Sequence, residues 1–142
     1  LHQCGTRGLD EARAAYAAAG VEVQVTAFID DMAAIYGWAD LAVCRAGALT
    51  LAELSAAGLG ALLVPFPHAV DDHQTRNAEV FVAVGAAELR QESDLDIEML
   101  AQRLAALLGD RRQLLAMAEA ARTLAKPDAA QVIAQACLEV AA

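Results

Sequence analysis

Residues 44–53 decide the fold, and they read Cys44-Arg45-Ala46-Gly47-Ala48-Leu49-Thr50-Leu51-Ala52-Glu53. The apolar run before them, from Asp40 to Cys44, predicts a short buried strand. Gly47 is then expected to let the backbone turn sharply before an alanine-rich helix that begins near Thr50. A strand, a glycine turn and a helix N-terminus together present free backbone N–H groups and the positive end of the helix dipole. Such a junction can hold a phosphate without help from Lys or Arg.

The same stretch allows a structural interpretation. Thr50 and Glu53 have the spacing of a capping box, in which the Thr hydroxyl and the Glu carboxylate satisfy the free N–H groups of the helix they begin. Capping and ligand binding are compatible for Thr50 but compete for the carboxylate of Glu53.

Length and composition limit the protein class. The 142 residues fit one domain with a sizeable core, and 58% hydrophobic residues with few aromatics predict packing by Leu, Val and Ala. A net charge of −9 argues against general nucleic-acid binding. Cys4, Cys44 and Cys137 lack CxxC spacing, which disfavours a disulfide framework or zinc site and favours a reducing compartment. No apolar run approaches the roughly 20 residues of a membrane span, so we expect a soluble chain without a transmembrane segment or secretion signal.

The order of elements predicts an α/β fold. Leu1–Gly5 looks like the tail of a strand, so the chain is expected to be a fragment of a longer protein. Alternating strands and helices predict a parallel sheet covered by helices on both faces. The loops that begin at Phe28, Arg45 and Phe66 should then meet at the edge where such sheets bind ligands. Strands are predicted over 21–29, 41–44, 61–65 and 86–89, and helices over 10–19, 30–38, 50–57, 72–84, 94–108, 110–124 and 128–140.

Several catalytic motifs are missing from the sequence. GxSxG, GxGxxG and GxxxxGK[ST] are all absent, which removes the main support for a nucleophile-elbow hydrolase, a dehydrogenase or an ATPase. His68, Asp71, Asp72 and His73 could be metal ligands, but Asp71 with Gln74 also fits a helix-start box, and no H-E-x-x-H spacing exists. A metal site is therefore not favoured.

Several motifs follow one another in a fixed order over about 50 residues. They are Phe28-Ile29-Asp30-Asp31-Met32, Ala39-Asp40, residues 44–53, Val64-Pro65-Phe66-Pro67-His68, Asp72-His73-Gln74 and Asn77-Ala78. Together they resemble the MurG family, the bacterial UDP-N-acetylglucosamine:N-acetylmuramyl-(pentapeptide) pyrophosphoryl-undecaprenol N-acetylglucosaminyltransferases of peptidoglycan synthesis. The resemblance implies the C-terminal domain of a two-domain GT-B glycosyltransferase. Residues 1–142 would form this Rossmann-like UDP-GlcNAc-binding domain, lacking its first strand and the glycine-rich loop after it.

The resemblance also implies roles for particular residues. The backbone of Ile29 would hydrogen-bond the uracil edge, Glu53 would accept hydrogen bonds from the ribose hydroxyls, and Gln74, with His73 beside it, would contact the GlcNAc hydroxyls. The ribose and diphosphate would lie along Ala48, Leu49, Thr50, Leu51 and Ala52. Ala46 stands where family members often carry Ser, which puts a polar contact there in doubt. No catalytic residue, metal or cofactor is implied for this chain.

The implied reaction moves GlcNAc from UDP-GlcNAc to the lipid-linked muramyl pentapeptide, with inversion, at the cytoplasmic face of the inner membrane. The enzyme would be peripheral and serve cell-wall synthesis, cell shape and division. Because the base and the acceptor site would lie in the missing N-terminal domain, this chain alone is expected to be inactive. Two alternatives stay open: a UDP-GlcNAc epimerase of the same architecture, and a non-catalytic interaction domain that docks a partner through the alanine-rich helices after Asp94.

Overall fold

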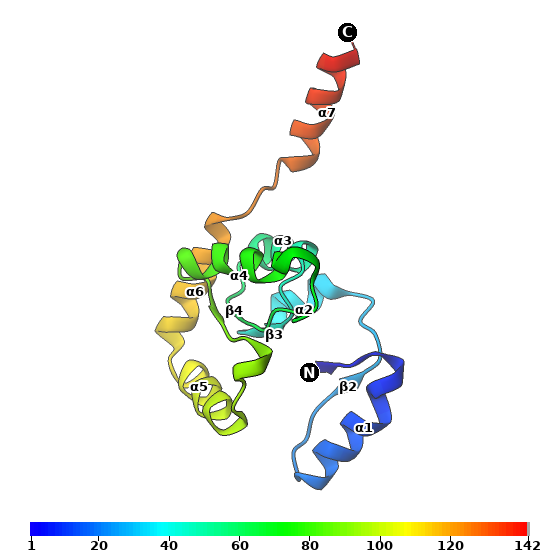
Figure 1. Cartoon of the computed structure of the whole chain (residues 1–142), viewed down its shortest axis with the longest axis vertical. Coiled ribbons are helices and arrows are strands. Elements are labelled where there is room, and N and C mark those ends of the chain that lie inside the picture. The colour runs from blue at the N-terminus through cyan, green and yellow to red at the C-terminus, as the bar shows by residue number, and fades with distance from the viewer. Residues whose placement is uncertain (142) are drawn as a thin grey trace. The chain divides into compact units, whose positions relative to one another are not determined.

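The computed structural model describes residues 1–141, and these form two compact units, residues 1–35 and residues 36–141 (Figure 1). That residues 1–142 act as one domain of a two-domain enzyme stays a prediction.

The first unit contains a two-stranded parallel sheet and one long helix. Strand β1 (His2–Gln3) pairs in parallel with β2 (Val25–Thr26), and α1 (Gly5–Ala18) contacts β2. The helix begins five residues before the predicted Asp10, because Gly5 and Gly8, both poor helix formers, hide its start in the sequence. The strand predicted over 21–29 is only two residues long, since β1 offers only two residues for pairing. Helix α2 (Met32–Trp38) follows, with the Asp31 carboxylate accepting a hydrogen bond from Ala34 N at 2.9 Å.

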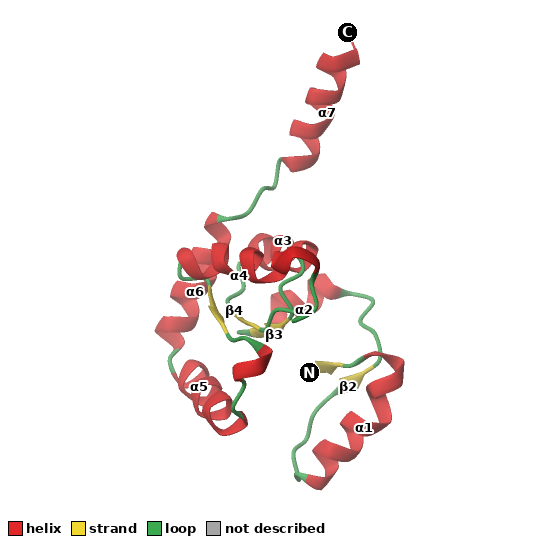
Figure 2. Cartoon of the chain, in the orientation of Figure 1, coloured by secondary structure: helices red, strands yellow, loops and turns green. Residues whose placement is uncertain are grey.

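The second unit is built on a three-stranded parallel sheet in the order β3-β4-β5. Figure 2 labels β3 and β4 of this sheet. The strands are β3 (Ala42–Cys44), β4 (Ala61–Leu63) and β5 (Ala87–Leu89). Cys44 pairs with Leu63, and Leu63 pairs with Leu89. Because the last residues of all three strands are in register, the segments that follow them leave from one edge of the sheet.

Helices α3 (Ala48–Ala57) and α4 (His73–Ala83) connect these strands and contact each other. Leu54 of α3 and Phe81 of α4 share the core with Ala61 and Leu63. Leu62, one residue out of phase, points to the opposite face of the sheet and is fully buried. The predicted Rossmann-like parallel sheet flanked by helices is therefore confirmed.

The remaining helices are α5 (Ile97–Gly109), α6 (Arg111–Thr123) and α7 (Ala129–Ala141). Asp96 and Asp110 cap the first two, each accepting a backbone N–H of the first turn. Helix α6 contacts both α3 and α5. Of the helices in residues 1–141, none combines the length and the apolar character needed to cross a membrane.

Candidate functional site

The turn between β3 and α3 is tighter than the sequence suggests. Helix α3 begins at Ala48, with Gly47 as its N-cap at φ −68° and ψ 140°. The turn predicted at Gly47 is present, but any residue can adopt this extended conformation, so the turn does not use the conformational freedom of glycine. The predicted capping box is wrong, because Thr50 is the third residue of the helix. Ala48 and Leu49 are good helix formers and extend the helix toward the sheet.

The first turn of α3 presents backbone N–H groups to the sheet edge. The first α-helical bond runs from Leu51 N to Gly47 O at 3.0 Å, so the N–H groups of Ala48, Leu49 and Thr50 precede the helical ladder. Leu49 is 81% exposed, whereas the Leu51 side chain is buried in the core. Because the Leu51 N–H already donates to Gly47 O, Leu51 has no free backbone donor for the ligand contact predicted there. This end of α3 is thus suited to an anion.

Two side chains of α4 hold the peptide groups of Ala46, which is fully buried. The Gln74 Oε1 accepts hydrogen bonds from Ala46 N at 3.2 Å and from Phe66 N at 3.0 Å. The Asn77 Nδ2 donates to Ala46 O at 3.2 Å. We call Ala46, Gln74 and Asn77 the turn clamp. The helix-start box predicted for Asp71 and Gln74 is wrong, because Asp72 is the N-cap and the Gln74 carbonyl reaches the neighbouring loop.

Arg45 fastens the turn to the other two loops of the sheet edge. Its Nη1 donates to Pro65 O at 3.0 Å and pairs with the Glu92 carboxylate at 2.5 Å. Its guanidinium also lies over the Phe66 ring, 5.6 Å from the centroid. Gln91 Nε2 donates to Thr75 Oγ1 at 3.1 Å and joins the segment after β5 to α4. The loops that follow β3, β4 and β5 are therefore cross-linked by side chains. The loop that begins at Phe28 follows β2, which within residues 1–141 pairs only with β1, so the prediction that it leaves from the same sheet edge is wrong.

Glu53 has a partner that its position in the sequence does not suggest. The Tyr36 hydroxyl donates to the Glu53 Oε2 at 2.8 Å. Tyr36 is half-buried against the core, while Glu53 is exposed. Burial and the neighbouring Glu53 carboxylate both raise the pKa of Tyr36 well above its usual range, so the phenol stays protonated and remains a donor.

The structure brings part of the predicted site together. The first turn of α3, Ala46 and Gln74 lie at one edge of the sheet, with the exposed His73 next to Gln74 in the chain. Glu53 follows Thr50 by three residues and so lies near it on the surface of α3. Ile29 belongs to the other unit, and its contact with a base stays a prediction.

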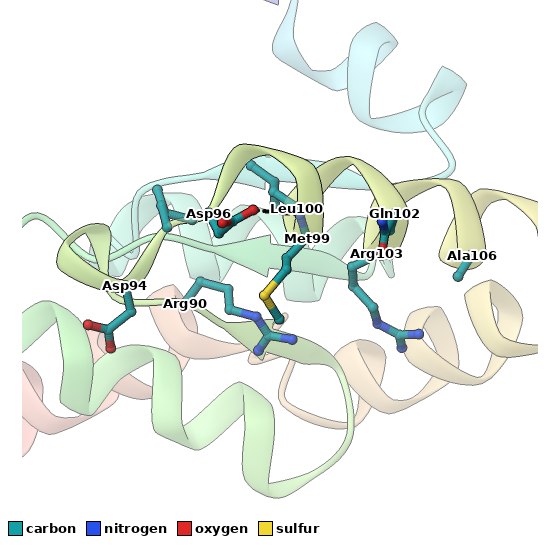
Figure 3. Close-up of a pocket in the computed structure, with 9 residues that line it drawn as sticks. Arg90, Asp94, Asp96, Met99, Leu100, Gln102, Arg103 and Ala106 are labelled. Atoms are coloured by element: carbon teal, nitrogen blue, oxygen red, sulfur yellow. Dashed lines mark hydrogen bonds between the residues drawn. The ribbon is translucent and has the colours of Figure 1, made fainter.

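A cavity of about 360 Å³ lies beside α5 and the segment before it (Figure 3). Arg90, Met99 and Arg103 are among its lining residues, and the predicted site residues are not. In the described part of the chain, His, Cys, Asp and Glu side chains form no group of three suited to a metal ion, and this includes the His68 to His73 segment.

Sequence reasoning missed the roles of Arg45, Asn77 and Tyr36. The spacing of Asn77 three residues after Gln74 puts both on one face of α4, and this is the one signal that could have suggested the pair. Tyr36 and Arg45 reach partners 17 and 20 residues away, and no local pattern encodes such contacts.

Comparison with known proteins places these observations in a family. Residues 1–133 match the glycosyltransferase family 28 C-terminal domain. The chain is 58% identical over 140 residues to a UDP-N-acetylglucosamine–N-acetylmuramyl-(pentapeptide) pyrophosphoryl-undecaprenol N-acetylglucosamine transferase of Marinobacter nauticus, and 58% identical to the protein of that name from Nitrosococcus oceani. Each alignment covers 99% of this chain and 39% of the relative.

A solved structure agrees with the sequence matches. The crystal structure of Acinetobacter baumannii MurG superposes with a TM-score of 0.90 at 44% identity, over 97% of this chain and 40% of that one. The chain thus spans about two fifths of the length of the relatives it matches. With the family match over most of its residues, this chain belongs to the glycosyltransferase family 28 C-terminal domain family.

Proposed function

We propose that this chain is the donor-binding part of an inverting N-acetylglucosaminyltransferase that uses UDP-GlcNAc. The observation that carries the proposal is the clamped turn before α3, where free N–H groups lie beside Gln74. The names of the relatives support a transferase rather than an epimerase of the same architecture. The acceptor would be the lipid-linked muramyl pentapeptide, and the complete enzyme would be peripheral at the cytoplasmic face of the inner membrane.

The geometry supports a specific electrostatic role for the turn. Departure of UDP from the sugar increases negative charge on the β-phosphate, and N–H groups at a helix N-terminus stabilise that charge more in the transition state than in the ground state. The turn clamp fixes these groups before any ligand arrives, so little reorganisation is needed. Glu53 would accept hydrogen bonds from the ribose hydroxyls, since one carboxylate can serve a pair of neighbouring hydroxyls.

Gln74 would contact the sugar through its amide nitrogen. Its carbonyl oxygen already accepts two backbone N–H groups, so Nε2 is the atom that would donate to a GlcNAc hydroxyl. Gln74→Glu keeps an acceptor for the turn and removes that donor. We expect this variant to bind UDP-GlcNAc no better than UDP.

UDP binding tests the proposal directly. The chain is titrated with UDP and followed by NMR, with Glu53→Ala as the test variant and Glu119→Ala, an exposed carboxylate on α6, as the matched control. Glu53→Ala should weaken UDP binding by about 1–3 kcal/mol, the scale for a hydrogen bond to a charged group. It should not change binding of 2′,3′-dideoxy-UDP. Chemical-shift changes confined to residues away from the turn and Glu53 would refute the proposed site.

Transfer itself has to be measured on the complete enzyme. With UDP-GlcNAc and the lipid-linked acceptor, full-length protein should release UDP and form the disaccharide product. This chain alone should bind UDP and transfer nothing, because the acceptor site and the general base are proposed to lie outside it. Conversion of UDP-GlcNAc to an epimer by the full-length protein would instead establish the alternative enzyme class.

A further inference from the structure

The Tyr36–Glu53 hydrogen bond joins a fixed side chain to an adjustable one. The Tyr36 ring packs against residues of the core, and its hydroxyl reaches the surface of α3 at Glu53 Oε2, 2.8 Å away. Glu53 is exposed, and an exposed glutamate samples many rotamers. Because the core holds the Tyr36 ring in place, the hydrogen bond from its hydroxyl limits the orientations that the Glu53 carboxylate can adopt.

This arrangement leaves much of the carboxylate available. A carboxylate has about four lone-pair sites, and the tyrosine occupies one of them on Oε2. Oε1 and the second site on Oε2 can still accept hydrogen bonds. Fixing a glutamate side chain costs conformational entropy, and a ligand that meets an already oriented carboxylate avoids part of that cost.

We propose that Tyr36 is a positioning residue that orients Glu53 toward the two ribose hydroxyls of a uridine nucleotide. This inference rests on the proposed function and extends it to a residue that contacts Glu53 rather than the ligand. Its consequence is selectivity, because orientation of the carboxylate matters only to a ligand whose sugar carries hydroxyls for Glu53 to accept.

Tyr36→Phe is the test, because it removes the hydroxyl and keeps the ring in the core. We expect UDP binding to this chain to weaken about 3- to 10-fold, the scale of one hydrogen bond. Binding of 2′,3′-dideoxy-UDP should be unchanged. Once Glu53→Ala is present, adding Tyr36→Phe should weaken UDP binding no further, since the two residues act through one contact.

Two controls separate orientation from general stability. Tyr16→Phe removes another tyrosine hydroxyl, one that lies 3.3 Å from His2 Nδ1 in the first unit, and it should leave UDP affinity unchanged. The melting temperature of each variant is measured alongside. A Tyr36→Phe variant that loses affinity equally for UDP and dideoxy-UDP has a structural role only, and this overturns the proposal.

Other outcomes are also decisive. If the unsubstituted chain prefers UDP over dideoxy-UDP and Tyr36→Phe keeps that preference in full, the role of Tyr36 is wrong and the proposed function stands. If the unsubstituted chain does not distinguish the two nucleotides, the ribose role of Glu53 is wrong, and the inference about Tyr36 falls with it.

Discussion

Replacing Gln74 with Met should loosen the turn before α3 by a predictable amount. Methionine has a similar length but offers no comparable acceptor, so Ala46 N and Phe66 N both lose their partner. Ala46 is fully buried, and a buried N–H without an acceptor costs about 1–3 kcal/mol. The hydrogen bond from Phe66 N lies in an exposed position, so this N–H can bond to water at little cost. The expected loss is therefore about 1–3 kcal/mol, and most of it arises at Ala46.

Amide hydrogen exchange measures this loss at the atom concerned. A cost of about 1–3 kcal/mol corresponds to exchange of the Ala46 amide that is roughly 5- to 150-fold faster. The amide of Arg90, which donates to Leu63 O at 2.9 Å, reports on the sheet and should change much less. Gln74→Glu keeps an acceptor and should preserve protection of Ala46 at pH 7.

The matched control is Gln102→Met, an exposed glutamine on α5, which should leave exchange at Ala46 unchanged. Unchanged exchange in Gln74→Met would show that the turn holds its position without the clamp, and the reasoning about Ala46 would be refuted. Faster exchange across the whole sheet would show a global loss of stability instead of a local one.

Three further predictions concern single residues. Gly47→Ala should change the free energy of unfolding by less than about 1 kcal/mol in thermal melts, because φ is −68° at Gly47 and an added Cβ lies 3.7 Å from Thr50 Oγ1. The same substitution should weaken UDP binding in a titration, because its methyl group would lie where we propose the phosphate binds. Burial raises the pKa of the Cys44 thiol from 9.0 to about 11, so iodoacetamide at pH 8 should alkylate it about 100-fold more slowly than it would a thiol of the ordinary pKa. Mass spectrometry should show that Cys44 is modified after the exposed Cys137. Hydrogen bonds from Arg103 hold the pKa of Glu88 below its ordinary value of 4.5. The ionised Glu88 therefore stabilises the folded state above pH 4.5, and this contribution is lost as the pH falls through the lowered pKa. Glu88→Gln should lower the melting temperature at pH 7 and lower it much less at pH 3.

Much of the fold could be predicted because local chemistry marks its elements. Gly58 has φ 71° and ends α3, and Pro65 follows β4 closely, so both boundaries were readable from residue type. Asp96 and Asp110 cap α5 and α6 close to the predicted starts. The start of α1 was harder to predict, because Gly5 and Gly8 lie inside this helix although glycine has a low helix propensity.

The site was less predictable because its fastening contacts join residues far apart in sequence. Gln74 and Ala46 are 28 positions apart, and only the fold brings the amide oxygen to that N–H. The spacing of Thr50 and Glu53 predicted the wrong helix start, since a four-residue motif cannot show that Ala48 and Leu49 are already helical. The residues named through the family resemblance could be listed in advance, whereas the side chains that hold them could not.

The two ends of the proposed nucleotide site differ in how they are held. The turn before α3 is fixed through both peptide groups of the buried Ala46, and Arg45 ties it to two other loops. Glu53 is exposed and restrained by the Tyr36 hydroxyl. Loss of the Gln74 or Asn77 side chain should therefore weaken binding of any nucleoside diphosphate, with or without ribose hydroxyls, because the N–H groups proposed to bind the phosphates are no longer held in place. Loss of the Tyr36 hydroxyl should weaken binding of ribonucleotides alone. If Asn77→Ala weakened binding of ribonucleotides alone and Tyr36→Phe weakened binding of UDP and dideoxy-UDP equally, the phosphate and ribose ends of the site would have been assigned the wrong way round.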